Sequence, residues 1–385
     1  MSTAQTIYLD YAAATPIDPK VIAAMQPYYS DKFYNPSATY NAARQVSKDL
    51  DAARAKVAHW LGSKSSEVIF TAGGSEANNL AIHGIMRQHP DANIVISSIE
   101  HESVLAAAHR YDCREVAVKP DGTIDLVDLE KKIDENTVLV SVMYANNEIG
   151  TIQPLRDVYE IIFKKRSDRS SQITNPQSLI LPLYFHADAC QSANYLDLNV
   201  ARLGVDLFTL NGGKIYGPKQ SGALFVKGGT KLQPLIDGGS QERGLRSGTE
   251  NVAGAIGFSV ALDLAQNMRH AETERIRTVQ QEFLKLIGQE IPTAIINGSL
   301  KRRLPNNVHA TLPGKDNERL LIQLDEAGVQ AAAGSACSAS SEEPSHVLKS
   351  IGLRDIEAQA SIRFTLGRQT TIEMIRRTVE LLSKF

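Results

Sequence analysis

A glycine-rich turn, an aspartate and a lysine each follow an apolar run in this sequence, where side chains could hold a small molecule. The turn lies within Thr71–Leu80 (TAGGSEANNL). Gly73 and Gly74 let a ligand approach the backbone, and Ser75 stands at the expected N-cap of a helix, where exposed amides favour an anion. The third glycine of a dinucleotide fingerprint is absent, so we predict a single phosphate. A plain strand-to-helix turn with a serine cap is the alternative.

The aspartate, Asp188, follows the apolar residues that lead into His186–Gln191 (HADACQ). A carboxylate at the C-terminal end of a parallel strand points into the crevice where open α/β sheets bind ligands. Asp188 there would suit a cationic ring nitrogen. A cap on a following helix is the competing interpretation.

The lysine, Lys214, lies in Asn211–Pro218 (NGGKIYGP), directly after a short apolar run. An amine desolvated at the end of a strand has a lowered pKa and can form a Schiff base with a carbonyl group. The alternative is a surface lysine in a turn. Together, a phosphate-binding turn, an aspartate for a ring nitrogen and a Schiff-base lysine are the parts that a pyridoxal 5′-phosphate site requires.

A fourth segment, Ala331–Ser341 (AAAGSACSASS), contains no side chain larger than that of Cys337. We expect such a stretch to form a mobile loop, and Cys337 to be a nucleophile that loop motion delivers to the site. A small cysteine in a tightly packed turn is the alternative.

The elements that must position these residues alternate between strands and helices through the first two thirds of the chain. Nearly continuous apolar runs predict strands at Glu67–Thr71, Asn93–Ser97, Val138–Met143, Leu179–His186 and Leu207–Leu210. Helical spacing occurs at Asn41–Leu61, Glu76–Arg87, Glu102–Arg110 and Val158–Lys165. This alternation predicts an α/β fold with a mostly parallel sheet covered by helices. The polar stretch Arg166–Gln177 is expected to be a surface loop.

The pattern changes after about Thr249, where a long helix is predicted from Asn251 toward Ile287 and is followed by short strands and helices. We expect a large cofactor-binding domain over residues 15–260 and a smaller C-terminal α/β domain over 261–385, joined by the N-terminal segment 1–14.

Composition limits the possible partners and compartment. The chain has 385 residues, and 41 Lys and Arg against 43 Asp and Glu give a net charge of −2, which offers no electrostatic case for nucleic acid or an anionic membrane. The three cysteines form no C-x-x-C pair, so a zinc site or a disulfide framework is not expected. With no signal-peptide pattern and no long apolar run, we predict a cytoplasmic protein and no metal.

Over nearly its whole length the sequence resembles the cysteine desulfurases of the NifS/IscS type, which are class V pyridoxal phosphate enzymes of fold type I. The motifs that carry the resemblance are YLDYAAATP (8–16), NPSA (35–38), EVIFTAGGSEANNLAI (67–82), the Glu100–His101 pair, NNEIGTIQP, HADACQ, GKIYGPK, RGLRSGTEN (243–251), GSACS and SIRFTLGR (361–368).

The resemblance implies which residues bind the cofactor. The matching positions are Lys214, Gly74, Ser75, His101, Asn147, Asp188, Gln191, Asn211 and Thr249. Lys214 matches the Schiff-base lysine, and His101 matches the histidine stacked on the ring. Asp188 matches the partner of the pyridine nitrogen, and Gln191 that of the phenolic oxygen. Thr249 matches a threonine that reaches the phosphate of the neighbouring subunit, which implies a homodimer with shared active sites.

The same resemblance implies the substrate contacts and the reaction. Asn35, Asn147 and Arg363 match residues near the substrate, with Arg363 receiving its carboxylate. Cys337, Lys214 and His101 match the catalytic residues. The implied activity converts L-cysteine to L-alanine and leaves sulfur on Cys337 as a persulfide, for an iron–sulfur scaffold or a tRNA-thiolation protein. A selenocysteine lyase, a class V aminotransferase and, more remotely, a non-catalytic scaffold are the alternatives.

Two positions depart from the pattern of the family. Gly213 stands where the family usually has a histidine that contacts the phosphate, and Tyr40 stands where many members have histidine. With the imidazole gone, we expect looser binding of the cofactor, and water or Tyr40 is the first candidate to replace the contact.

Overall fold

The protein is described by a computed structural model that covers residues 6–171, 181–334 and 344–385. Within these residues the main sheet has seven strands in the order β2-β8-β7-β6-β5-β3-β4. Their bounds are β2 Val68–Thr71, β3 Asn93–Ser97, β4 Asp112–Val116, β5 Thr137–Ser141, β6 Tyr184–Asp188, β7 Leu207–Asn211 and β8 Gly222–Val226. The strands β7, β6, β5, β3 and β4 are parallel, and β8 runs antiparallel to both of its neighbours. The predicted mostly parallel α/β sheet is confirmed.

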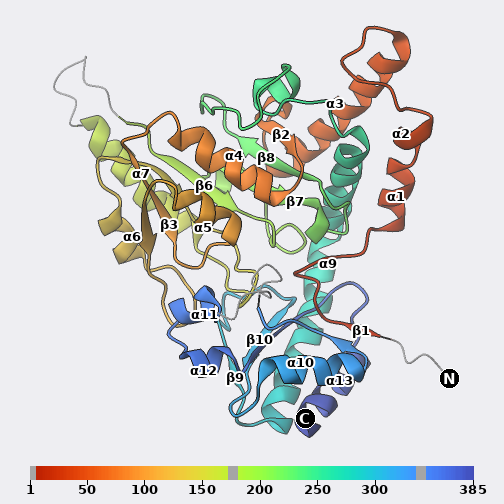
Figure 1. The fold of residues 1–385 in the computed structure, drawn as a ribbon, viewed down its shortest axis with the longest axis vertical. Coiled ribbons are helices and arrows are strands. Elements are labelled where there is room, and N and C mark those ends of the chain that lie inside the picture. Colours follow the sequence, from red (N-terminus) through yellow and green to blue (C-terminus); the bar gives the residue numbers. More distant parts are fainter. Residues whose placement is uncertain (1–5, 172–180, 335–343) are drawn as a thin grey trace.

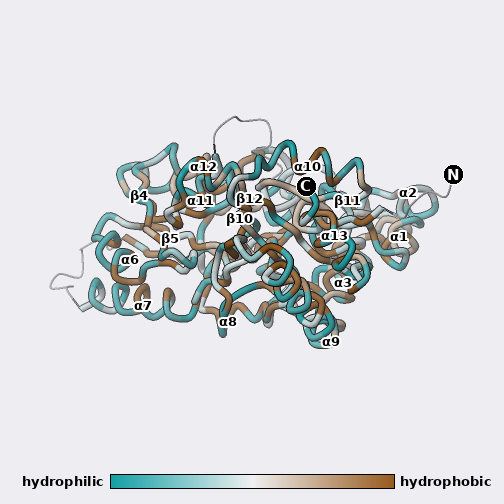
Figure 2. The backbone as a smooth tube through the Cα atoms, turned by 90° about the horizontal axis from the view of Figure 1, so that it is seen from below, coloured by the Kyte–Doolittle hydropathy of each residue, from teal (hydrophilic) through white to brown (hydrophobic). Residues whose placement is uncertain are grey.

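Helices cover both faces of this sheet (Figure 1). They are α1 Pro19–Met25, α2 Pro27–Ser30, α3 Asn41–Leu61, α4 Gly74–Met86, α5 Glu102–Ala108, α6 Leu126–Lys132, α7 Leu155–Ser171 and α8 Val200–Leu203. Side chains of β3 show why the middle of this strand is apolar throughout: Ile94 and Ile96 join the core formed with α4 and α5, whereas Val95 joins the opposite core. In Figure 2 the peripheral helices, such as α7, alternate between hydrophilic and hydrophobic residues along the chain, as helices with one buried face do.

The long helix α9 (Val252–Glu290) connects the main sheet with the C-terminal part of the fold (Figure 1). Its first half contributes Phe258 and Leu262 to a core of the main sheet. Its second half contributes Ile276 and Phe283 to a separate core. One continuous helix therefore spans residue 260, where the sequence analysis divided the domains, and that division stays a prediction.

The second core belongs to a small antiparallel sheet in the order β12-β10-β9, with bounds β9 Ile295–Ile296, β10 Asn307–Thr311 and β12 Ser361–Thr365. Around it lie α10 Asn317–Glu326, α11 His346–Ser350, α12 Asp355–Ala358 and α13 Ile372–Lys384. Near the N-terminus, β1 (Ile7–Tyr8) pairs in parallel with β11 (Val329–Gln330). This pairing holds the start of the chain against its C-terminal third.

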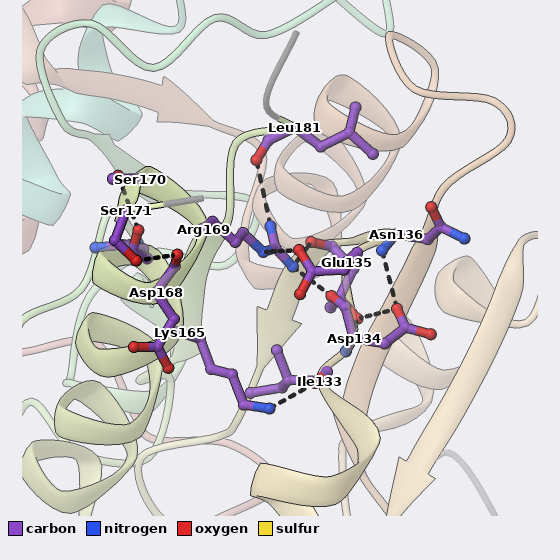
Figure 3. A network of polar contacts seen from close by, with 12 residues as sticks. Ile133, Asp134, Glu135, Asn136, Lys165, Asp168, Arg169, Ser170, Ser171 and Leu181 are labelled. Carbon is purple, nitrogen blue, oxygen red and sulfur yellow. Dashed lines mark hydrogen bonds and ion pairs between the residues drawn. The ribbon is translucent and has the colours of Figure 1, made fainter. Parts of the chain in front are cut away.

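The structure contradicts the surface loop predicted from Arg166. Helix α7 continues to Ser171, so residues 166–171 are helical, and the rest of the stretch lies outside the described residues. Arg169 is buried and donates to the carbonyl groups of Asp134 and Leu181 (Figure 3). It also donates to the carbonyl of Thr137. These bonds satisfy the buried guanidinium and fix the last turn of the helix. The charged and polar residues of this stretch suggested an exposed loop and gave no sign that Arg169 is buried.

Candidate active site

Most of the predicted site residues line one cleft of about 580 Å³ between the main sheet and the C-terminal sheet. They are Gly74, Ser75, His101, Asn147, Asp188, Gln191, Asn211, Lys214 and Arg363. Asp188 ends β6, Asn211 ends β7, and the two strands are parallel neighbours. Because the carboxyl ends of parallel strands share one edge of a sheet, the fold assembles residues that lie far apart in the sequence.

Asp188 is a buried carboxylate, only 5 % exposed. Its Oδ2 accepts a hydrogen bond from Asn78 Nδ2 (2.7 Å), and its Oδ1 accepts one from the amide of Cys190 (2.9 Å). No ion pair to this carboxylate occurs among the described residues. It closes a local turn, but the described residues 189–199 contain no helix before α8. A buried anion of this kind favours a cationic group in the cleft, such as a protonated ring nitrogen.

Lys214 ends a short 3-10 helix, Gly212–Lys214, that directly follows β7. Its Nζ lies in the cleft and donates to the carbonyl of Ala13 (2.5 Å). The backbone before it is fixed, because the amide of Gly213 donates to Asn211 Oδ1 (2.9 Å). This amine is therefore presented to the cleft, as a covalent attachment point requires.

The glycine-rich turn differs in one detail from the prediction. Helix α4 begins at Gly74, and its N-cap is Gly73, which has a φ of 120°. Ser75 therefore lies in the first turn and is not the cap. A Cβ on Gly74 would lie 2.5 Å from Cys190 Sγ, so this close packing requires glycine. The free amides of the first turn still face the cleft and favour an anion such as a phosphate.

His101 is the N-cap of α5, and this role fixes its protonation pattern. Its Nδ1 accepts a hydrogen bond from the amide of Ser103 (3.1 Å). In the neutral ring the proton therefore resides on Nε2. His101 lines the cleft, so an imidazole with a donor at Nε2 borders the ligand space.

Arg363 on β12 is almost completely buried, at 1 % exposure. Its Nη2 pairs with Asp10 Oδ1 (2.7 Å), and its Nη1 donates to the carbonyl of Asn147 (3.0 Å). Its Nε has no hydrogen-bond partner among the described residues. An unpaired buried donor costs about 1–3 kcal/mol, so this guanidinium keeps one hydrogen-bonding position unfilled beside the cleft that Arg363 lines.

Two predicted residues do not line this cleft. Asn35 is exposed and accepts a hydrogen bond from the amide of Ser37 (2.9 Å). Thr249 is also exposed, and it lies between Gly248 and Glu250, which line a different cleft. Cys337 lies outside the described residues, so its predicted loop and role stay predictions. The role expected for Thr249 requires a second copy of the chain and also stays a prediction.

Neither Cys113 nor Cys190 has the electrostatics of an activated thiolate. Burial is the main cause that raises the pKa of Cys113 to about 12. Burial, with the nearby Asp188, holds the pKa of Cys190 well above its usual value. Both therefore stay protonated at neutral pH, and thiolate chemistry at either position is disfavoured.

Two contact residues were missed by the sequence analysis. Asn78 lies one helical turn after Ser75 on α4, and this spacing places it on the same face of the helix as Ser75. Asp10 pairs with Arg363 across most of the chain length, and no local pattern indicates such a contact.

The described residues contain no group of His, Cys, Asp and Glu side chains suited to a metal ion. Every helix within those same residues is too short or too polar to span a bilayer.

The Aminotransferase class-V family matches residues 7–378 of the chain. A protein named Cysteine desulfurase IscS from Dictyoglomus turgidum is 40% identical over 98% of this chain and 94% of its own length. The chain belongs to the cysteine desulfurase family. Cysteine desulfurase IscS 1 from Archaeoglobus fulgidus is 37% identical over 97% of this chain and 95% of its own length. The family resemblance predicted from the sequence motifs is thus confirmed.

Solved structures agree with this cysteine desulfurase assignment. A structure titled NifS-like protein has a TM-score of 0.89 at 29% identity and covers 99% of both chains. A structure titled SspA in complex with cysteine has a TM-score of 0.79 at 34% identity, covering 94% of this chain and 99% of its own. Together they confirm the predicted class of fold, in which helices flank a mostly parallel sheet.

Proposed function

We propose that this protein is a pyridoxal phosphate-dependent cysteine desulfurase that converts L-cysteine to L-alanine and leaves the sulfur on Cys337 as a persulfide. The observation that carries the proposal is one cleft that holds a lysine amine, a buried carboxylate that has no ion-pair partner among the described residues, and a buried arginine with a donor that those residues leave unfilled.

The described residues fit pyridoxal phosphate at three points. Asp188 offers the buried negative charge that a pyridinium nitrogen needs, and Lys214 offers an amine for covalent attachment. The start of α4 at Gly74 offers backbone amides for the phosphate. When bound, the cofactor supplies an electron sink for charge that develops at the α-carbon of the substrate.

The residues of the chain then have separable tasks. Arg363 binds the substrate carboxylate, while Asp10 holds the guanidinium in place. Lys214 Nζ is the base at the cleft for the α-proton, and His101 Nε2 is a second group that can exchange a proton there.

Cys337 takes the sulfur in a balanced two-electron step. Its thiolate attacks the sulfur atom of the substrate, forming an S–S bond as the C–S bond breaks. The electron pair of that bond remains with the carbon skeleton, which takes up a proton and leaves as alanine. We propose a homodimer in the cytoplasm, and an iron–sulfur scaffold or a tRNA-thiolation protein as the acceptor of the persulfide sulfur.

Alanine and persulfide measured from L-cysteine test the proposal in wild type and in Cys337→Ala. We expect stoichiometric alanine and a protein-bound persulfide in wild type and neither in the variant. Cys113→Ala is the matched control and should behave like wild type, because burial keeps that thiol protonated. An intact rate of alanine formation in Cys337→Ala would refute the desulfurase assignment and favour an aminotransferase.

A further inference from the structure

The active-site cleft continues past the start of α4 into a second hollow. This hollow shares Gly74, Ser75, Asn211 and Lys214 with the main cleft and adds Gly213 and Lys219 to its lining. It therefore forms the end of the site at which backbone amides favour an anion.

Charged side chains in this hollow are few. Glu76 also lines it, but its Oε1 pairs with Arg246 Nε (3.0 Å) and its Oε2 accepts from the amide of Ala72 (2.9 Å). Lys214 is the proposed point of covalent attachment for the cofactor. Lys219 has no ion pair with a carboxylate of the described residues. Its positive charge is thus available to a ligand.

Lys219 is held beside Gly213 by a single residue. Its Nζ donates to the carbonyl of Thr15 (2.6 Å), while the amide and hydroxyl of Thr15 both donate to the carbonyl of Gly213 (3.2 and 3.1 Å). A Cβ placed on Gly213 would lie 3.9 Å from Lys219 Cγ. The lysine side chain therefore borders the space that the glycine leaves without a side chain.

We propose that Lys219 is a phosphate-binding residue, whose ammonium group neutralises the phosphate dianion of the cofactor at this end of the cleft. The inference rests on the proposed function, since it assumes that the cofactor is a phosphate ester. Tyr40, the replacement contact considered from the sequence, is exposed and lines neither hollow of the site.

Equilibrium binding of two probes to the apoprotein tests this role without an activity assay. Pyridoxal phosphate and pyridoxal differ only in the phosphate. We expect Lys219→Met to weaken binding of pyridoxal phosphate by about tenfold, as loss of one charge-assisted contact at a partly exposed site does, and to leave pyridoxal binding unchanged. Lys20→Met on α1 removes the same charge from an exposed position that lines neither hollow, and should bind both probes like wild type.

A second pair of variants tests the same contact in the opposite direction. Lys219→Arg keeps the charge and should retain most of the affinity. Gly213→His in the Lys219→Met protein should recover affinity for pyridoxal phosphate, because it restores the histidine with which the family usually contacts the phosphate. A side chain fits at this position, since a Cβ at Gly213 would meet Asn211 Oδ1 at 3.4 Å, an ordinary contact. Equal losses for both probes in Lys219→Met, or no loss for either, would overturn the inference while the proposed function stands. If wild type binds neither probe, the proposed function itself fails.

Discussion

At the scale of single residues, the environment of Asp188 favours the proposed role of its carboxylate beside a cofactor over a purely structural role. Its two oxygens accept hydrogen bonds from Asn78 and from the Cys190 amide, and neither donor carries a charge. Asn78 Oδ1 is itself buried and has no hydrogen-bond partner among the described residues. The carboxylate is therefore oriented but not neutralised, which leaves its charge for a ligand in the cleft.

Asp188→Asn isolates this charge. The new amide oxygen can still accept from the Cys190 amide, and the Asn78 side chain can rotate so that its unpaired Oδ1 accepts from the new amide group. We therefore expect a folded, cofactor-containing protein whose turnover falls by about 10²–10⁴-fold. Steady-state rates and cofactor absorbance measure the two effects, and Asp91→Asn at an exposed position is the control. Near-normal turnover would reduce Asp188 to a structural residue of the turn.

At the scale of elements, the sequence predicted what local patterns encode. The continuous apolar run of β3 and the amphipathic helix α3 have their predicted bounds. Strand β4 was missed because its sequence, DCREV, is mostly polar and only its last residue, Val116, is buried at the sheet edge. The end of α7 was missed because the carbonyl groups that receive Arg169 come from distant residues. Long-range contacts of this kind have no local signature in the sequence.

The contact between α4 and the turn after β6 gives a prediction about stability. A Cβ at Gly74 would lie 2.5 Å from Cys190 Sγ, and both residues line the cleft. We expect Gly74→Ala to lower the free energy of unfolding by about 1–3 kcal/mol, as overpacking does. Gly74→Ala with Cys190→Ala should regain most of this loss, because the clashing sulfur is gone. Urea unfolding of the single and double variants measures it; a double variant no more stable than Gly74→Ala would contradict the clash.

At the scale of the whole molecule, the site depends on contacts that join the two ends of the chain. Asp10 follows β1 and pairs with Arg363 on β12, and Thr365 bonds to the backbone of Leu9 and Ala12. The N-terminal segment thus binds the C-terminal sheet and also contacts Lys214 through Ala13. These pairings span more than 200 residues, so the sequence indicated the components of the site but not how they are held together.

One buried histidine in each of the two larger sheets links the stability of the whole molecule to pH. Burial lowers the pKa of His186 on β6 to about 4 and that of His309 on β10 to about 3, both from 6.5. Below pH 6.5 the unfolded chain therefore binds protons that the folded protein excludes, so stability is full above pH 6.5 and falls as the pH drops toward 4. Two such groups give a slope of up to about 2.7 kcal/mol per pH unit.

Urea unfolding at several pH values between 7 and 4 measures this slope, and His186→Gln assigns its origin. The glutamine amide can still bond the hydroxyl groups of Ser141 and Thr209, which the imidazole contacts at 2.8 and 3.0 Å, but it cannot take up a proton. Carboxylates also contribute to acid sensitivity. Their contribution is the same in wild type and in the variant, so the difference between the two slopes excludes it. We expect the variant to lose up to about 1.4 kcal/mol per pH unit of the slope below pH 6.5. His59→Gln, the same substitution at an exposed histidine, is the control. If His186→Gln keeps the wild-type slope, the folded protein already accommodates a protonated imidazole within the main sheet, and its acid sensitivity comes from other groups.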